Sequence, residues 1–215
     1  MKREWLLPTG LILLSFVPIL AGVLRLTELS TGAEVTPANA RFFAAPVPIV
    51  MHIVGASVYC VLGAFQFVPG IRRHHPRWHR YAGRVLVLCG LAAALSGIWM
   101  TLTYPLPSPS GPLLTGFRLV FGSLMAASIV LAFLAIRRHD VATHRAWMIR
   151  GYAIGQGAGT QAILLGLGPA LFGPPGVLTQ AVLMGAAWVI NLGVGEVFIR
   201  RRTVRTPHRV LVEVR

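Results

Sequence analysis

The sequence is poor in acidic residues and in lysine. Its 215 residues include only six Asp and Glu, and Lys2 is the single lysine, yet the 20 Lys and Arg give a formal net charge of +14. Only 12% of the residues are charged, 55% are apolar, and the mean hydropathy is +0.68. A soluble nucleic-acid-binding protein spreads many more charges over its surface. The composition therefore excludes that class and predicts a membrane protein whose cations are gathered in loops.

Cysteine is scarce as well, and so are long polar stretches. Cys60 and Cys89 both lie in apolar runs, so we expect two reduced thiols packed on helix faces rather than a disulfide. The segments between the apolar runs are too short to form a soluble domain.

Six runs of about 20 apolar residues are each long enough to cross about 30 Å of hydrocarbon. They cover residues 5–26, 46–68, 81–104, 114–136, 147–170 and 177–199. The first follows a charged start that resembles a signal peptide, but no small-residue cleavage site is clear before Arg25 and Glu28, so we expect a retained helix. The sequence predicts a single all-α domain over residues 1–215, an integral membrane bundle of six helices.

The cations predict an orientation for this bundle. Of the 20 Lys and Arg, 17 lie in the N-terminus, in segments 71–84 and 137–150, and in the tail 200–215, which the six spans place on one side. Only Arg25, Arg41 and Arg118 lie on the other side. By the positive-inside rule both termini are cytoplasmic, and residues 200–215 form a basic cytoplasmic tail.

Two of the basic segments resemble each other. Residues 71–80 (IRRHHPRWHR) and 136–145 (IRRHDVATHR) are identical at six of ten positions, at a constant offset of 65. Each segment leaves an even-numbered span and enters an odd-numbered one. Helices two and three therefore form a possible parallel tandem repeat with helices four and five, related by a pseudo-two-fold axis along the membrane normal. Chance identity in arginine-rich loops is the alternative.

The repeat would make His79 and His144 equivalent. Two imidazoles that face each other across such an axis suit the axial ligands of one b-type haem, or two ligands of another metal ion. Helix capping and headgroup contacts are the alternative roles. Glycines follow both histidines, at positions 83, 90 and 97 and at 151, 155 and 159, and they permit either close helix packing or space for a flat macrocycle.

A second polar group lies on the opposite side of the predicted membrane. His52, Arg118 and Arg25 are ionisable residues at the outer ends of their spans, with His52 roughly 25 Å from the cytoplasmic boundary at 1.5 Å per residue. Such residues are costly in a bilayer and tend to line a cavity or to pair with one another. This outer polar site could bind an anionic or quinone-like headgroup; snorkelling, or a pair with Glu28, is the alternative.

Polar residues also occur within the last two spans. Glu196 could pair with Arg200 four positions on, or turn inward toward an arginine that follows His79 or His144. Together with Asn191 and Gln156 it could also support a ligand histidine as a hydrogen-bond acceptor. Seven arginines near the cytoplasmic ends of the predicted spans are expected to contact anionic lipid headgroups. They are Arg72, Arg73, Arg137, Arg138, Arg200, Arg201 and Arg202.

Several of these motifs resemble a known family. His52, residues 63–67 (GAFQF), 79–84 (HRYAGR), 144–150 (HRAWMIR) and 188–191 (WVIN) with Glu196 are similar to the bacterial predicted membrane proteins of domain-of-unknown-function family 2306. The resemblance covers residues 46–200. It implies a multi-helix integral protein of a bacterial inner membrane and no particular reaction. The histidines are also loosely similar to those of transmembrane b-type cytochromes and ferric reductases, although a second outer histidine is missing.

Two functional hypotheses follow. The first is a small redox protein that holds one haem b or a metal through His79 and His144 and exchanges electrons with a lipid-soluble or outer partner such as a quinone. The second is a transporter or lipid-binding protein whose outer cations contact a small-molecule ligand. A structural or assembly subunit is a third alternative, and nucleic acid is not expected as a partner.

Overall fold

The computed structural model describes residues 4–105, 110–174 and 176–203, and all regular structure in these ranges is helical. The long helices are α1 (Leu6–Thr31), α3 (Pro46–Phe65), α5 (Pro76–Thr103), α6 (Pro112–Arg137) and α9 (Val177–Thr203). Between α6 and α9 lie two consecutive helices, α7 (Val141–Gly155) and α8 (Gly157–Phe172). Two short helices, α2 (Ala40–Ala44) and α4 (Pro69–His74), belong to connections.

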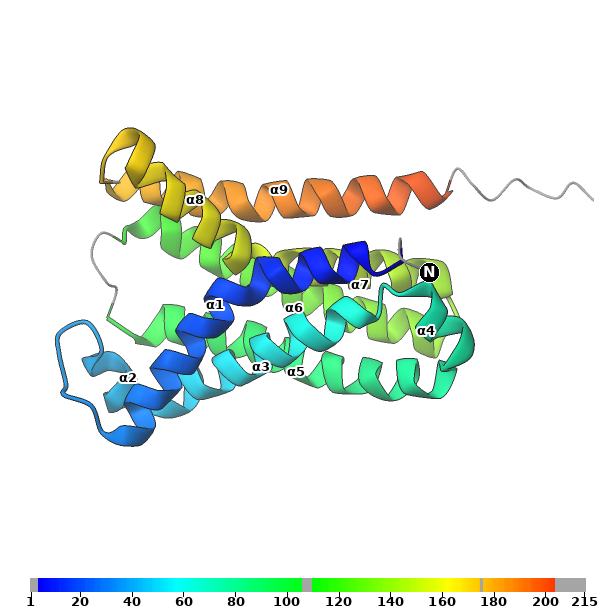
Figure 1. Cartoon of the computed structure of the whole chain (residues 1–215), viewed down its shortest axis with the longest axis horizontal. Coiled ribbons are helices and arrows are strands. Elements are labelled where there is room, and N and C mark those ends of the chain that lie inside the picture. The colour runs from blue at the N-terminus through cyan, green and yellow to red at the C-terminus, as the bar shows by residue number, and fades with distance from the viewer. Residues whose placement is uncertain (1–3, 106–109, 175, 204–215) are drawn as a thin grey trace, which may run out of the picture.

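The helices form one elongated bundle (Figure 1). Helix α3 packs against α5 and α6 packs against α7, while α5 and α6 join these two hairpins. Helix α1 lies on α3 and α8, and α9 lies on α6, α7 and α8. We call the two ends of the bundle the α2 end and the α4 end, after the short helix at each. The start of α1 and the end of α9 both lie at the α4 end.

The exposed surface confirms a membrane protein built from helices. Five of the described helices, α1, α3, α5, α6 and α9, are long and apolar enough to cross a bilayer. Their outward faces carry large apolar side chains, such as Leu13 at 68% and Leu178 at 67% exposure, whereas Ser15 and Ser128 are buried. An exterior that is more apolar than parts of the interior is favourable in lipid and unfavourable in water.

The predicted span over residues 147–170 is not one continuous helix, because this segment consists of two helices that meet at Gln156. Glycines at 155 and 157 flank the break and lower helix propensity. The Gln156 side chain, 3% exposed, lies among hydrogen-bond partners from other parts of the bundle. A discontinuous helix of this kind is a common feature of membrane proteins that bind small molecules near the bilayer midplane.

The predicted starts at residues 81 and 147 are too late. Helix α5 begins at Pro76, because proline suits the first turn of a helix, and α7 begins at Val141. The carboxylate of Asp140 caps α7 by accepting a hydrogen bond from the Thr143 N–H at 3.0 Å. Hydrogen bonding by the Thr143 side chain, together with this backbone contact, lowers the pKa of Asp140. Hydropathy marks where the apolar face begins, whereas proline and capping residues set the start of the helix.

His79 and His144 occupy equivalent positions, since each is the fourth residue of its helix. The connections that precede them differ. Helix α3 ends at Phe65 and the separate helix α4 follows, whereas α6 continues to Arg137 and the chain reverses through His139 at φ 61°. The sequence similarity of the two basic segments therefore does not extend to the backbone of the connections.

Most of the glycines that follow these histidines serve close packing. A Cβ added at Gly90 would lie 2.6 Å from Tyr59 Cε2, and one at Gly155 would lie 3.0 Å from Tyr59 Cε1. A Cβ at Gly159 would lie 2.2 Å from the Leu14 carbonyl oxygen. Only at Gly83 among these is the space within 4 Å open. Glycine allows α3 and α1 to approach α5, α7 and α8 this closely.

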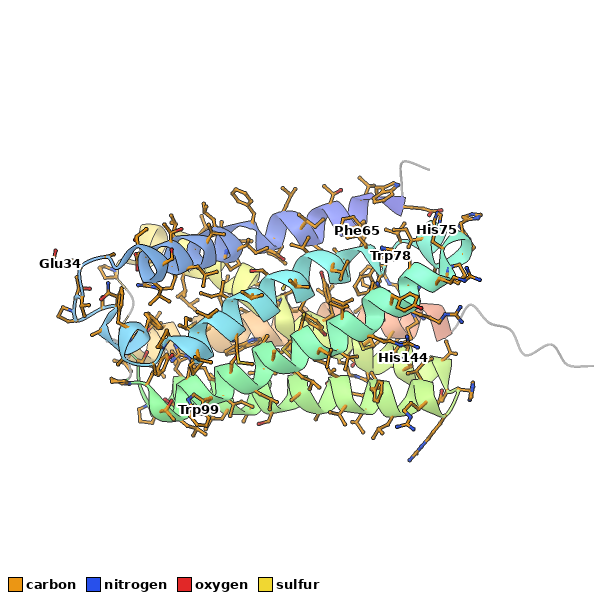
Figure 2. The ribbon with its side chains drawn as sticks, turned by 90° about the horizontal axis from the view of Figure 1, so that it is seen from below. Glu34, Phe65, His75, Trp78, Trp99 and His144 are labelled. Carbon is orange, nitrogen blue, oxygen red and sulfur yellow. The ribbon has the colours of Figure 1, made fainter. Side chains whose placement is uncertain are left out.

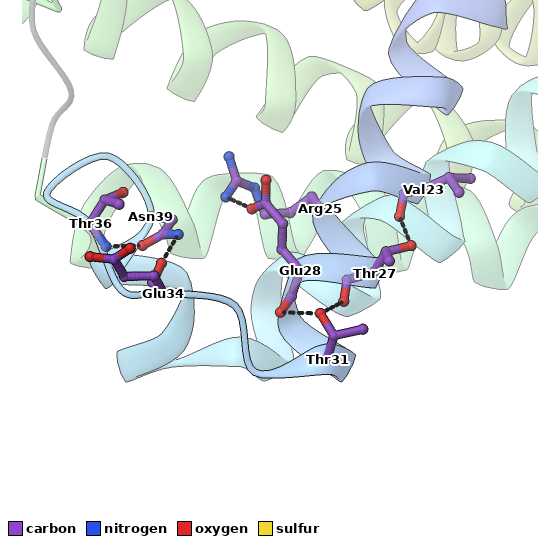
Figure 3. Close-up of polar contacts among 8 residues, drawn as sticks. All are labelled: Val23, Arg25, Thr27, Glu28, Thr31, Glu34, Thr36 and Asn39. Carbon is purple, nitrogen blue, oxygen red and sulfur yellow. Dashed lines mark hydrogen bonds and ion pairs between the residues drawn. The ribbon is translucent and has the colours of Figure 1, made fainter.

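The connection between α1 and α3 is held by side-chain hydrogen bonds (Figure 3). Gly32 ends α1 in the left-handed conformation at φ 64°, which glycine adopts without strain. Asn39 accepts a hydrogen bond from the Thr36 N–H at 2.7 Å and donates one to the Glu34 carbonyl at 3.0 Å. These contacts set the start of α2 and therefore the position of Arg41.

Candidate functional site

A cavity of about 400 Å³ lies in the α2 half of the bundle, and we call it the large cavity. Its size is in the range of small-molecule sites. Helices α3, α5, α6, α7, α8 and α9 all contribute to its mostly apolar wall, which includes Ile49, Ala56, Ala93, Met100, Met125 and Trp188. Tyr104 and Pro105 lie at its α2 end, and Tyr59 and Gly155 lie at its deepest part.

Two arginines line the large cavity at the α2 end. Arg41 comes from α2 and Arg118 from the first two turns of α6. Their guanidinium groups repel each other, and no carboxylate among the described residues forms an ion pair with either one. Burial and the neighbouring Arg25 lower the pKa of Arg41. Two uncompensated cations beside an apolar cavity are costly, so an anionic group placed between them would be stabilised.

Arg25 is the third cation of the predicted outer polar site, but it does not line the cavity. It forms an ion pair with Glu28 on the same helix (Figure 3). The guanidinium carbons of Arg25 and Arg41 each lie 4.6 Å from the centre of the Phe42 ring, a favourable cation–π distance. Arg25 therefore holds Phe42 and Arg41 at the α2 end, while its own charge is neutralised by Glu28.

His52 lines the large cavity together with Arg118. Its Nδ1 lies 2.8 Å from the Ala93 carbonyl oxygen and 3.4 Å from Ser96 Oγ. Since a carbonyl only accepts, Nδ1 carries the proton in this contact and Nε2 keeps a free lone pair. The structure thus brings His52 and Arg118 of the predicted outer site into one cavity, and it adds Arg41.

His79 and His144 both lie at the α4 end of the bundle. Figure 2 shows His144 at the same end as His75 and Trp78. The two imidazoles are close enough to interact electrostatically. His144 Nδ1 donates to the Ala132 carbonyl at 2.9 Å, whereas His79 Nδ1 is buried without a hydrogen-bond partner. No third His, Cys, Asp or Glu joins them to form a metal-ligand cluster within the described part of the chain.

Glu196 pairs with an arginine that follows His144, rather than with Arg200. Arg150 Nε donates to Glu196 Oε1 at 2.5 Å, and a second guanidinium nitrogen donates to Oε2 at 3.2 Å. Arg150 also stacks on the Trp147 ring at 4.7 Å. This bidentate pair joins α7 to α9 and contacts neither His79 nor His144 in the hydrogen bonds of the described residues.

Breaking the Arg150–Glu196 pair is expected to destabilise the protein. Glu196→Gln leaves a partly buried arginine without a counter-charge, so we expect the free energy of unfolding to fall by about 1–2 kcal/mol. Thermal unfolding in detergent micelles measures this. The double variant Glu196→Gln with Arg150→Gln should recover part of the loss, and additive losses would contradict a direct interaction.

Asn191 and Gln156 also have partners other than a histidine. Asn191 Oδ1 accepts a hydrogen bond from Thr160 at 2.8 Å, which joins α9 to α8. Gln156 Nε2 donates to the Tyr152 hydroxyl at 2.8 Å, and Gln156 Oε1 lies 2.9 Å from Ser15 Oγ. The predicted support of a ligand histidine by these residues is therefore absent from the described hydrogen bonds.

A buried polar layer surrounds Gln156 in the middle of the bundle. It consists of Ser15, Tyr59, Tyr152 and Gln156, and we call it the central polar layer. The Tyr152 hydroxyl donates to the Cys60 carbonyl at 2.6 Å. The Tyr59 hydroxyl, on a residue that is 1% exposed, has no hydrogen-bond partner among the described residues. From the sequence alone, the two tyrosines are indistinguishable from ordinary apolar core residues.

The two tyrosines are expected to respond differently to the loss of the hydroxyl. Tyr152→Phe removes two hydrogen bonds and leaves the Gln156 amide unsatisfied, so the free energy of unfolding should fall by about 1–2 kcal/mol. Tyr59→Phe removes an unpartnered hydroxyl and should leave stability unchanged or raise it by up to about 1 kcal/mol. Thermal unfolding of both variants in one detergent compares them; equal losses would contradict this description of the layer.

The predicted lipid-contacting cations lie at the α4 end or beyond it. Arg73 forms an ion pair with Glu4 at 3.4 Å. Arg137 and Arg138 are exposed at the end of α6, and Arg200 and Arg201 are exposed at the end of α9. The side chain of Arg202 and the rest of the tail, 204–215, lie outside the described residues. Both cysteines are free, with Cys60 buried and Cys89 partly exposed.

Comparison with known proteins gives one family. Residues 49–199 match the family described as Predicted membrane protein (DUF2306), which is more than half of the chain. The chain belongs to this family. No protein with a curated description and no solved structure matches it significantly. The DUF2306 match starts in α3 and ends in α9, so it includes most of both hairpins and, apart from Arg41, Phe42 and Ser15, the residues of the large cavity and of the central polar layer.

Proposed function

We propose that this DUF2306 protein binds an anionic amphiphile in the large cavity, with the headgroup between Arg41 and Arg118 and a single hydrocarbon chain along the apolar wall. A phosphate or carboxylate headgroup accepts charge-assisted hydrogen bonds from arginine. The imidazole of His52, in the wall of the same cavity, offers the ligand a further polar contact. This function belongs to the lipid-binding or transporter class.

One observation carries the proposal. Arg41 and Arg118 line a cavity of about 400 Å³ without an ion-pair partner among the described residues, although Arg25 beside them has Glu28. A purely structural role would be expected to provide a counter-charge, as Glu196 does for Arg150. The ligand's headgroup would supply the missing negative charge.

We also propose a membrane topology in which the α2 end, and with it the headgroup site, faces the outside of the cell. The start of α1 and the end of α9 lie at the same end of the bundle, which suits six crossings if α7 and α8 together make one. The excess of cations at the α4 end then favours both termini in the cytoplasm of a bacterial inner membrane. A cysteine placed at Thr36 should react with an impermeant maleimide in intact cells; protection there, with labelling at Thr143→Cys, would reverse the orientation.

The binding proposal is tested with purified full-length protein in detergent. Decyl phosphate carrying a fluorescent NBD group should bind at one site, and unlabelled decyl phosphate should displace it. Inorganic phosphate and decylubiquinone are added as separate competitors, which distinguishes recognition of a lipid-like anion from that of a free anion or of a quinone. Displacement by inorganic phosphate alone, or by the quinone alone, contradicts an anionic amphiphile as the ligand.

The histidine pair at the α4 end supports a second candidate, a haem b held by His79 and His144. His144 has the tautomer that leaves Nε2 free for a metal, and His79 has a buried nitrogen without a partner. A haem bound there would supply one-electron transfer. The two imidazoles are suitable ligands for haem iron. However, neither of the two described cavities is lined by these histidines, so neither provides space for a haem beside them.

The haem candidate has its own spectroscopic test. Membranes that contain the protein should show a Soret band and a reduced alpha band after dithionite, and both should be lost in His79→Ala and in His144→Ala. A folded, colourless preparation from haem-supplemented cells would contradict it. Arg118→Gln is the matched control, because it leaves the two histidines in place.

A further inference from the structure

A second cavity lies in the opposite half of the bundle. This small cavity of about 260 Å³ lies between α1, α7 and α9, and its wall is formed by residues such as Leu7, Leu11, Phe67, Ile149 and Phe198. It extends toward the α4 end, whereas the large cavity extends toward the α2 end. Ile149 and Gly195 line this cavity, and the residues next to them in the sequence, Arg150 and Glu196, form the ion pair between α7 and α9.

The central polar layer and the end of α7 lie between the two cavities. Tyr59 lines the large cavity, while Tyr152 and Gln156 line the small one. The centres of the two tyrosine rings lie 5.7 Å apart. The α7–α8 segment borders both spaces, because Ile154 and Gly155 face the large cavity and Ala153 faces the small cavity.

The construction of the central polar layer suits movement. The helix is already interrupted at Gln156, between two glycines, so a change of backbone angle there disrupts no continuous helix. The Tyr152–Gln156–Ser15 hydrogen bonds join three side chains rather than backbone groups. The Tyr59 hydroxyl is buried without a partner, which is unfavourable in the resting protein and would be relieved by a polar headgroup beside it.

We propose that the central polar layer is a gate, and that the protein moves its anionic amphiphile between the large and the small cavity and so across the middle of the membrane. The inference rests on the proposed function, since it takes the same ligand. Tyr59 contacts the headgroup in transit, and opening requires release of Gln156 from Tyr152 and Ser15. Movement is down the ligand's gradient and needs no energy source.

The test uses the full-length protein in liposomes that contain NBD-decyl phosphate in both leaflets. Dithionite added outside destroys the outer fluorescence at once and the inner fluorescence only after translocation. We expect the protein to accelerate the slow phase at least tenfold over protein-free liposomes. Gln156→Leu should increase this acceleration at least threefold, because it removes the two hydrogen bonds that must be released for opening. It should keep binding within twofold, because Gln156 lines only the small cavity.

Gln66→Leu is the matched control, since Gln66 lines neither cavity and its Nε2 is buried without a partner. It should translocate the probe at the wild-type rate, and an unchanged or reduced rate in folded Gln156→Leu, or an equal change in both variants, would overturn the gate. Binding by the wild type without translocation overturns this inference alone, whereas failure of the wild type to bind overturns the proposed function as well.

Tyr59→Phe keeps the inference testable if Gln156→Leu does not fold. Because the Tyr59 hydroxyl makes no hydrogen bond in the described structure, this variant is expected to remain folded. Translocation should slow at least fivefold at concentrations of NBD-decyl phosphate that saturate binding. An unchanged translocation rate in folded Tyr59→Phe would overturn the role of this hydroxyl and the gate built on it.

Discussion

Replacing Arg118 with glutamine should weaken the binding of decyl phosphate by about 10- to 100-fold. A hydrogen bond to a charged group contributes about 1.5–3 kcal/mol when its partner is retained, and 1.4 kcal/mol corresponds to a factor of ten in affinity. Arg41→Gln should have a similar but smaller effect, because α2 lies nearer the end of the bundle. The double variant should lose about 1,000-fold, which direct titration of NBD-decyl phosphate measures.

The control for these variants removes the same charge elsewhere. Arg77 is exposed near the start of α5, at the α4 end, so Arg77→Gln should change affinity by less than twofold. The unliganded Arg118→Gln protein should also be at least as stable as the wild type, since a poorly compensated cation has been removed. An Arg118→Gln protein that is folded and binds normally would contradict the proposed headgroup site.

Gly159→Ala should destabilise the protein strongly. The added Cβ would lie 2.2 Å from the carbonyl oxygen of Leu14, and a backbone atom cannot move aside as a flexible side chain can. Helices α1 and α8 must separate, so we expect the free energy of unfolding to fall by about 3 kcal/mol, at the upper end of the cost of overpacking. Thermal unfolding in detergent should show a marked decrease in the midpoint.

Gly166 provides the comparison on the same helix. No atom lies within 4 Å of a Cβ placed there, so Gly166→Ala should be neutral or stabilising by up to about 1 kcal/mol through helix propensity. If the two variants have equal stabilities, α1 does not pack against α8 as described, and the contribution of α1 to the wall of the small cavity would be wrong too.

Hydropathy predicted the positions of most long helices, but it could not detect the break at Gln156. Residues 155–159 (GQGAG) are less apolar than their surroundings, but they are too few to interrupt a run of about 20 residues. The break depends on glycine and on hydrogen-bond partners from α1 and within α7. The early starts of α5 and α7 were missed for a related reason. His79 and His144 lie on polar first turns, where Pro76 and Asp140, rather than apolar residues, determine the start of the helix.

The candidate site was predictable only in part. His52 and Arg118 stand out because charged or titratable residues are rare in spans, and the structure places both in one cavity. The predicted outer polar site did not include Arg41. The position of Arg41 depends on α2, a helix of five residues that neither hydropathy nor a capping motif in the sequence indicates. Tyr59 and Tyr152 could not be distinguished from core aromatics, since their importance depends on which hydroxyl has a partner.

Prolines at the starts of α3, α5 and α6 have a consequence for the bilayer. Because proline cannot donate a backbone hydrogen bond, these helices cannot lengthen backward by extending the same ladder when the surrounding lipid becomes thicker. Helix α5, with 28 residues, is about 42 Å long at 1.5 Å per residue, well beyond about 30 Å of hydrocarbon. Adaptation to membranes of different thickness must therefore come from tilting of whole helices, which would change the width of the bundle at its two ends.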